Sequence, residues 1–365
     1  MIYLDANASE PLRQPAREAA LAAMGGLGNP SSVHAAGRAA RRTLETARES
    51  LAVRFGAAPA EVIFTSGGTE ANALAVHALG RGRRLLTGAT EHDAIRAAAP
   101  AATIIAVDAE GVADLDALRR LLADCGPALV CLMLANNETG TLQPVAEAAA
   151  LCRAAGAWLH VDAVQAAGRI DVDRAALGAD SLALSGHKLG GPAGAGALLL
   201  GPAAAEHMVP LIAGGGQERG RRGGTPPLPA IAGLAAAATA AATDDAGRRL
   251  APLRDAIEQA ALACGAVALG AGAARLPNTT CLALPGVAAL TQVIALDLAG
   301  VAVSAGAACS SGKVARSHVL TAMGAGRLAG EAIRVSLPWS ATAADAAACI
   351  AAYQAMAARL SRAVA

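Results

Sequence analysis

The chain has 365 residues, of which 54% are hydrophobic, 2% aromatic and 16% charged. At roughly 150 residues per domain, this length predicts two domains, and the high apolar content excludes a disordered chain. The 30 Lys and Arg residues balance the 29 Asp and Glu residues to a net charge of +1, which argues against a protein that binds nucleic acid through bulk charge.

The first residues carry no sign of secretion or membrane insertion. The N-terminus, MIYLDANASEPLR, lacks a basic region and places Asp5 and Glu10 where a signal peptide needs an apolar run. The longest uncharged stretches, 189–205 and 223–243, contain Pro, and their Ala and Gly residues give little drive into lipid. The seven Cys residues include no C-x-x-C pair, which argues against a disulfide framework and a zinc site. We therefore expect a cytoplasmic protein with no metal site.

Short apolar runs alternate with amphipathic stretches over the first two-thirds of the chain. The predicted strands are 61–65, 84–87, 103–107, 129–134, 158–161, 181–184 and 196–200. Helices are predicted from Thr69, over 115–122 and over 145–155. Continuous apolar strands separated by helices indicate βαβ units, and hence a mostly parallel sheet covered on both faces.

The pattern changes near Thr243. A long helix is predicted over 244–262 and is followed by strands at 280–284, 301–304 and 333–337 and helices at 291–298 and 343–360. This succession is typical of a smaller α+β domain. We predict domains at 1–245 and 246–365, with residues 1–28 packing against either one.

A turn with two glycines follows the first predicted strand. The segment Thr65-Ser66-Gly67-Gly68-Thr69-Glu70-Ala71-Asn72 leads from that strand into a helix. The glycines let the backbone approach an anion, so free N–H groups and the Thr69 hydroxyl would form a phosphate cradle at the helix N-terminus. The alternative is an ordinary helix cap, which is the commoner case for such a segment taken alone.

Asp162 and Lys188 follow two later strands. Asp162 closes an apolar strand in His160-Val161-Asp162-Ala163-Val164-Gln165, and Lys188 lies in Ser185-Gly186-His187-Lys188-Leu189. Ligands of parallel α/β sheets bind at the carboxyl ends of strands, so both residues would lie at one edge of the sheet. The acid could hold a cationic ring nitrogen, and the amine could form a Schiff base with a carbonyl cofactor. A capping Asp and a solvated Lys are the alternatives.

Cys309 is the one cysteine set in a run of small residues, 303–312. The neighbouring Lys313 and Arg316 would favour its thiolate. The other cysteines lie in apolar or helical settings, where a thiol behaves as a small inert hydrophobe. Such a buried thiol is also the alternative for Cys309.

His92 and Arg334 complete the set of candidates. His92 follows the strand predicted at 84–87, although a lone His is more often structural than catalytic. Arg334 lies within a predicted strand, where a buried guanidinium needs an anionic partner. A substrate carboxylate could pair with it through two hydrogen bonds. The Gly-rich segment with Arg219, Arg221 and Arg222 indicates either an anion-facing loop or a solvated one.

These candidates occur in an order that is itself informative. With further matching segments they occupy 3–8, 28–34, 65–70, 90–92, 136–140, 160–165, 185–188, 214–225, 304–311 and 333–334. As a set they resemble the cysteine desulfurases, enzymes of the class V aminotransferase fold that depend on pyridoxal 5′-phosphate (PLP). The Cys segment is similar to that of the subfamily with a long Cys loop, which includes the nitrogen-fixation and iron–sulfur enzymes.

The resemblance implies a fold and a role for each residue. The fold would be that of a fold-type-I (aspartate aminotransferase-like) PLP transferase, with a large, mostly parallel-sheet domain and a smaller α+β domain. Lys188, His92 and Cys309 would be catalytic, as Schiff-base lysine, ring-stacking proton-transfer residue and sulfur nucleophile. The implied cofactor-binding residues are Gly68, Thr69, His92, Asn137, Asp162, Gln165, Ser185, His187, Lys188 and Thr225. Asp162 would pair with the ring nitrogen, Thr225 would reach the partner subunit's phosphate, and Asn137 and Arg334 would bind the substrate carboxylate.

The implied function is conversion of L-cysteine to L-alanine, with the sulfur held as a persulfide on Cys309 for iron–sulfur cluster or thio-cofactor assembly. A homodimer and a sulfur-acceptor protein are the implied partners, and no nucleic acid or membrane is expected. Two alternatives stay open: a selenocysteine lyase or other class V enzyme, and a degenerate homologue that serves as a scaffold.

Overall fold

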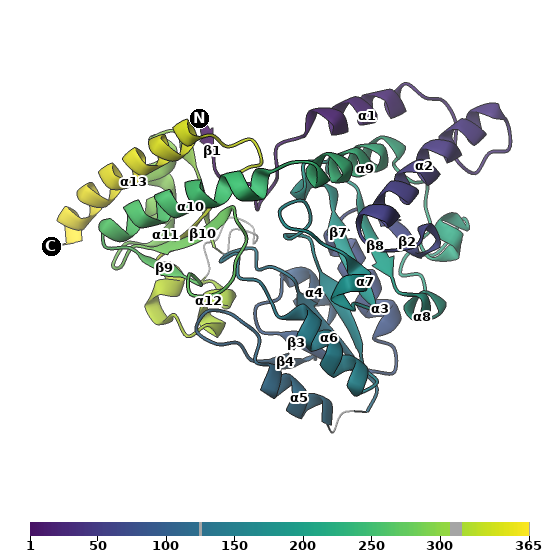
Figure 1. The fold of residues 1–365 in the computed structure, drawn as a ribbon, viewed down its shortest axis with the longest axis horizontal. Coiled ribbons are helices and arrows are strands. Elements are labelled where there is room, and N and C mark those ends of the chain that lie inside the picture. The colour runs from purple at the N-terminus through teal and green to yellow at the C-terminus, as the bar shows by residue number, and fades with distance from the viewer. Residues whose placement is uncertain (124–125, 307–315, 365) are drawn as a thin grey trace.

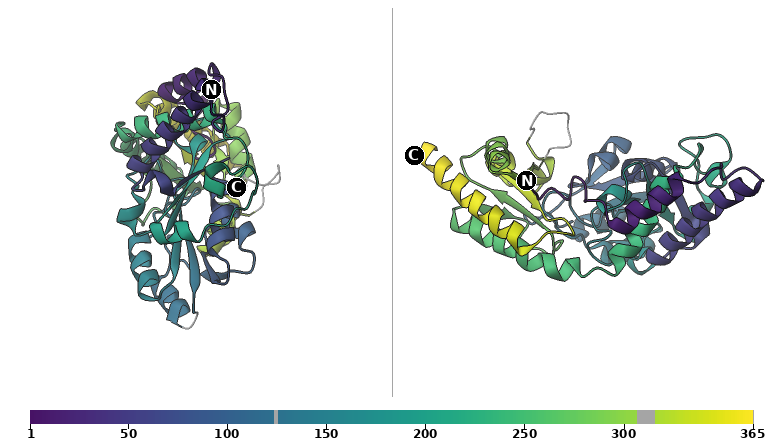
Figure 2. Two further views of the ribbon diagram at one scale, coloured as in Figure 1. Left: turned by 90° about the vertical axis from the view of Figure 1, so that its right-hand side faces the viewer. Right: turned by 90° about the horizontal axis from the view of Figure 1, so that it is seen from above.

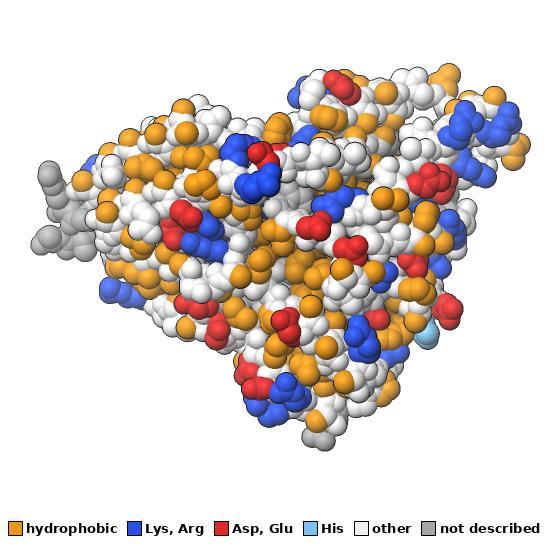
Figure 3. All heavy atoms as spheres, viewed as in Figure 1, with side chains coloured by type: hydrophobic (Ala, Val, Ile, Leu, Met, Phe, Trp, Pro, Cys, Tyr) orange, Lys and Arg blue, Asp and Glu red, His pale blue; other side chains and the backbone are white. Residues whose placement is uncertain are grey.

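The computed structural model describes residues 1–123, 126–306 and 316–364. These residues form two main sheets, each with its own hydrophobic core, side by side along the long axis of the molecule (Figures 1 and 2). On the face viewed in Figure 3, acidic and basic side chains are interspersed, in keeping with the near-zero net charge. No helix within the described residues is long and apolar enough to cross a membrane.

The larger sheet has the strand order β2-β8-β7-β6-β5-β3-β4 among the described residues. Its strands are β2 (Val62–Thr65), β3 (Arg84–Gly88), β4 (Thr103–Ile105), β5 (Ala128–Met133), β6 (Trp158–Asp162), β7 (Ser181–Ser185) and β8 (Gly196–Leu200). Strands β4, β3, β5, β6 and β7 run parallel, whereas β8 is antiparallel to both β7 and β2. The sheet is therefore mostly parallel, as the sequence predicted.

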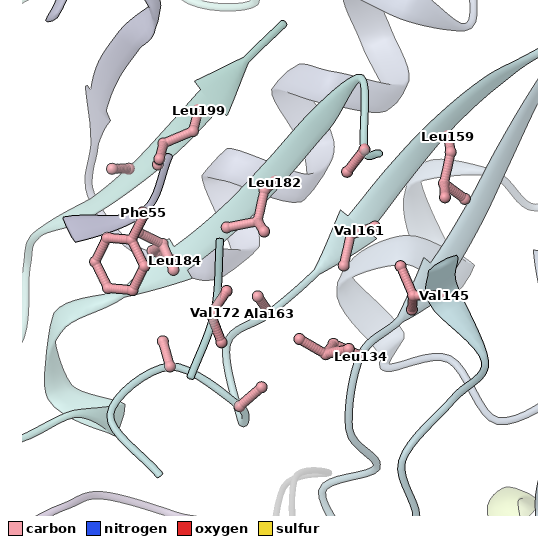
Figure 4. Packing of buried hydrophobic residues seen from close by; sticks show 14 of the residues in the cluster. Phe55, Leu134, Val145, Leu159, Val161, Ala163, Val172, Leu182, Leu184 and Leu199 are labelled. Carbon is pink, nitrogen blue, oxygen red and sulfur yellow. The ribbon is translucent and has the colours of Figure 1, made fainter. Parts of the chain in front are cut away.

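Helices cover both faces of this sheet. They are α3 (Gly68–Leu79), α4 (Asp93–Ala98), α5 (Leu115–Ala123), α6 (Val145–Ala154), α7 (Arg174–Leu177) and α8 (Pro202–Glu206), joined by α1 (Gln14–Met24), α2 (Ala35–Arg54) and α9 (Leu228–Ala242). Successive strand residues face opposite cores. Leu182 and Leu184 belong to a cluster with residues of α6 and α9 (Figure 4), whereas Ala183 belongs to a cluster with residues of α3. Burial on both faces explains the continuous apolar runs of these strands.

The second sheet is antiparallel, with the order β12-β13-β10-β9. It comprises β9 (Val267–Leu269), β10 (Thr279–Ala283), β12 (Ser304–Ala305) and β13 (Ala332–Ser336). Helices α10 (Ala246–Ala263), α11 (Ala289–Leu298), α12 (His318–Ala322) and α13 (Ala343–Val364) surround it. The single strand expected at 301–304 is divided, because β11 (Val301–Ala302) leaves this sheet and pairs with the N-terminus.

The N-terminal segment runs from the second sheet to the first. Strand β1 (Ile2–Tyr3) pairs in parallel with β11, and the Ala6 amide then donates to Ser336 O. Farther along, the Glu10 amide donates to His187 O, and α1 packs on α9. The segment therefore passes the carboxyl edge of the large sheet. The division of the chain at 245/246 stays a prediction.

Candidate active site

A cavity of about 420 Å³ opens at the carboxyl edge of the larger sheet. This volume lies within the range of small-molecule sites, roughly 300–1,000 Å³. The sequence-predicted residues that line it are Gly68, Thr69, His92, Asn137, Asp162, Gln165, Ser185, His187 and Lys188. Thr225 and Arg334 do not line it, and Cys309 lies outside the described residues. Residues about 120 positions apart in sequence therefore meet at one sheet edge, as strand-end placement predicts.

One end of the cavity is built by the turn between β2 and α3. A Cβ on Gly68 would lie 2.6 Å from Val164 Cγ2, so the turn packs closely against the segment after β6. The N-terminal amides of α3, the Thr69 hydroxyl and the Ser185 hydroxyl therefore converge on one space. Burial lowers the pKa of His187 to about 4, so this imidazole is neutral near pH 7 and contributes hydrogen bonding rather than charge. These groups suit an oxyanion such as phosphate.

Asp162, the last residue of β6, is fully buried in the cavity wall. One carboxylate oxygen accepts the Val164 N–H at 2.9 Å, and the other accepts the Asn72 side-chain amide at 2.6 Å. Burial raises the pKa of Asp162, while these donors and the nearby His92 and Lys188 oppose that rise. A cation brought against this carboxylate would stabilise its ionised form.

Lys188 lies in the turn that follows β7. Its Nζ donates to Asn7 O at 2.5 Å and to Ala8 O at 3.0 Å. Gln165 also donates to Asn7 O, at 3.0 Å. The N-terminal segment therefore contacts both side chains, and sequence reasoning did not foresee its place in the site.

Arg334 is buried behind Asn137. Its guanidinium donates to Asn137 O at 3.0 Å and forms an ion pair with Asp5 at 2.6 Å. The anionic partner that the sequence required is thus an aspartate of the chain itself. The Nε of Arg334 is buried and has no hydrogen-bond partner within the described residues.

The described residues on either side of the Cys309 segment meet at Glu138. Ser317 Oγ donates to Glu138 Oε2 at 2.6 Å, and a Cβ on Gly306 would lie 2.3 Å from the same oxygen. Glu138 adjoins Asn137 in the chain, so Gly306 and Ser317 both lie next to the cavity wall. By contrast, burial raises the pKa of Cys281 and Cys131, which suits inert thiols.

Comparisons with known proteins identify the family. The family described as Aminotransferase class-V matches residues 2–348. This chain belongs to the class V aminotransferases. A cysteine desulfurase of Cereibacter sphaeroides is 43% identical, over 94% of this chain and 92% of its own length.

Solved structures give the same fold. A NifS-like protein of Rickettsia africae is 34% identical and superposes with a TM-score of 0.90 over 98% of this chain and 99% of that one. SspA in complex with cysteine is 28% identical, with a TM-score of 0.81 over 93% of this chain and 99% of that one. The class V chain described here therefore has the fold-type-I architecture expected from its sequence.

The donor set of this class V site fits PLP. Oxyanion donors lie around the α3 N-terminus, a buried carboxylate lies at the end of β6, and an amine lies after β7. These match a phosphate, a ring nitrogen and an aldehyde.

The arginine loop of this class V chain is held by one partly exposed and one buried ion pair. Arg222 donates to Glu70 at 2.7 and 3.1 Å, and Glu218 accepts from Arg48 at 2.7 and 2.8 Å. Glu218 and Arg219 have φ values of 48° and 59°, a left-handed conformation that non-glycine residues seldom adopt. Ion pairs therefore hold the loop at Glu218 and Arg222, whereas Arg219, and Thr225 beyond the loop, are exposed.

We expect Glu218→Ala to lower the free energy of unfolding by about 3–5 kcal/mol, the usual cost of leaving a buried charge without its partner. Both side chains of the pair are at least 96% buried, at 4% and 3% exposure. Glu45→Ala is the matched control, because Glu45 contacts the same arginine but is 40% exposed, and its loss should cost under about 1 kcal/mol. Chemical denaturation measures both, and equal effects would contradict this expectation.

Asn72 lines the cavity and the backbone of Asn7 contacts Lys188 and Gln165, but the sequence interpretation gave neither residue a role. Asn72 lies four positions after Gly68 on α3 and so shares its face, a spacing that could have indicated it. Asn7 reaches the site through its backbone carbonyl, which no residue type reveals.

Proposed function

We propose that this chain is a PLP-dependent cysteine desulfurase that converts L-cysteine to L-alanine and carries the sulfur on Cys309. The observation that supports this most is the cavity itself, which brings Asp162 and Lys188 together at the ends of two neighbouring parallel strands. The relatives named cysteine desulfurase and the neighbour solved with cysteine support the same substrate class.

In this proposal each residue has a defined task. PLP, when bound, supplies an electron sink that no side chain provides. Lys188 Nζ would hold the cofactor covalently and would move the substrate's α-proton, and His92 would stack on the ring. Asp162 would keep the ring nitrogen protonated, and Gln165 would donate to the ring oxygen. Gly68, Thr69, Ser185 and His187 would bind the phosphate, while Asn137 and Arg334 would bind the substrate carboxylate.

The sulfur step balances without an added oxidant. The Cys309 thiolate attacks the substrate sulfur and forms an S–S bond as the substrate's C–S bond breaks. The electron pair of that bond stays with the substrate carbon, which takes a proton and becomes the methyl group of alanine. The persulfide keeps the proton of the substrate thiol, and the proton that the Cys309 thiol gave up balances the one taken by the methyl carbon. A dithiol then reduces the persulfide to sulfide and becomes a disulfide.

The decisive experiment is a product balance. The purified chain, given PLP, L-cysteine and dithiothreitol, is expected to form alanine and sulfide in equal amounts. Pyruvate with sulfide, or no product at all, would contradict the proposed function. A parallel assay with selenocysteine separates the two candidate substrates, since a selenocysteine lyase would turn over that substrate and leave cysteine unchanged.

A homodimer accompanies this function. Exposed apolar side chains gather in the segment from α1 to the start of α2, with Leu21, Met24, Leu27 and Val33 all at least 60% exposed, and such patches mark interfaces. In the dimer, Thr225 would reach the partner subunit's phosphate. Sedimentation as a monomer would contradict this arrangement. We place the enzyme in the cytoplasm, where it would supply a sulfur-acceptor protein of iron–sulfur or thio-cofactor assembly.

A further inference from the structure

A relay of buried hydrogen bonds, formed by Ser181, His160 and Asn72, leads away from the cavity behind Asp162. Asn72 Nδ2 lies 2.6 Å from Asp162 Oδ2, and Asn72 Oδ1 lies 2.9 Å from His160 Nε2. His160 Nδ1 in turn lies 2.8 Å from Ser181 Oγ. Ser181, His160 and Asn72 are at most 1% exposed. The relay links β7, β6 and α3 and ends on the Asp162 carboxylate, which faces the cavity.

The donor and acceptor of every hydrogen bond in this relay follow from the chemistry of the groups. A carboxylate only accepts, so the Asn72 amide nitrogen must face Asp162 and its oxygen must face His160. That oxygen also only accepts, so His160 Nε2 carries a hydrogen. Burial lowers the pKa of His160 to about 3, so the ring is neutral and Nδ1 accepts from the Ser181 hydroxyl. All three donors therefore point toward Asp162.

This one-way arrangement has a consequence for the carboxylate. Each Asp162 oxygen receives one N–H, from Val164 or from Asn72, and keeps acceptor capacity toward the cavity. If the Asn72 amide were flipped, its oxygen would face Asp162 Oδ2, and two hydrogen-bond acceptors would then oppose each other. The relay thus fixes both the rotamer of the carboxylate and its role as acceptor.

Resting on the function proposed above, we propose that Ser181, His160 and Asn72 are positioning residues that hold Asp162 as an acceptor aimed at the ring nitrogen of the cofactor. A merely structural role would require only that these buried polar groups satisfy one another. The two roles differ in their effect on affinity. If the relay positions Asp162, its loss should weaken the binding only of a ligand that has a ring nitrogen.

The test therefore compares two ligands. Dissociation constants are measured for PLP and for 1-deazapyridoxal 5′-phosphate, in which a C–H replaces the ring nitrogen. The wild-type apoprotein is expected to bind PLP more tightly. In Asn72→Leu, which keeps the side-chain size, the ratio of the two constants should fall about tenfold, since a hydrogen bond to a charged group is worth at least that factor. Gln292→Met is the control, because it removes an equally buried amide on α11 and should leave the ratio unchanged.

A second pair of variants serves if Asn72→Leu does not fold. His160→Gln can donate to Asn72 and accept from Ser181, so it should keep the wild-type ratio, whereas His160→Leu should lower it. A wild-type ratio in Asn72→Leu, or equal ratios in the two His160 variants, would overturn the relay. Equal binding of both ligands by the wild-type protein would instead overturn the assignment of Asp162 in the proposed function, and the relay with it.

Discussion

A Cys309→Ala variant is expected to bind PLP as the wild-type protein does and to release neither alanine nor sulfide. Without this thiol no group accepts the substrate sulfur, and removal of a nucleophile commonly costs 10³-fold or more in rate, roughly the loss seen in other covalent enzymes. The described neighbours support this choice of nucleophile, because Gly306 and Ser317 both contact Glu138 beside Asn137.

The measurement follows alanine by amino-acid analysis and sulfide by colorimetry, with the PLP absorbance recorded in the same samples. Cys264→Ala is the matched control: it makes the same substitution at a partly buried thiol at the end of α10 and should retain both products. Undiminished sulfide from Cys309→Ala would assign the nucleophile elsewhere.

The strand-end residues were predictable because topology alone brings them together. In a parallel sheet every strand ends at the same edge, so Asp162 after β6 and Lys188 after β7 meet whatever the loops do. The antiparallel direction of β8 was not predictable, since a strand buried on both faces reads as the same apolar run in either direction.

The sequence also did not predict the long-range contacts that are made by backbone atoms or by oppositely charged side chains. The need of Arg334 for an anion was visible, but its pairing with Asp5 depends on where the N-terminal segment runs. The same segment brings Asn7 O to Lys188. Glu10 is buried against Arg169 and accepts the Trp339 amide at 2.5 Å, so its cost of burial is offset by partners 159 and 329 residues away.

Lys188→Ala is expected to leave PLP held without a covalent bond and to lower turnover by about 10³-fold or more, because it removes both the attachment point and the group that moves the α-proton. The chain suits this test unusually well, as Lys188 and Lys313 are its only lysines. Apart from the N-terminal amine, borohydride reduction can therefore fix the cofactor at just two side chains.

Peptide mapping after borohydride treatment gives the readout. The wild-type protein and Lys313→Ala, the matched control, should carry one cofactor on the peptide that contains Lys188, and Lys188→Ala should carry none. Label on Lys313 in the wild-type protein would contradict the assignment. Because Asn7 O and Ala8 O accept from Lys188 Nζ, cofactor attachment would draw the amine away from these carbonyls.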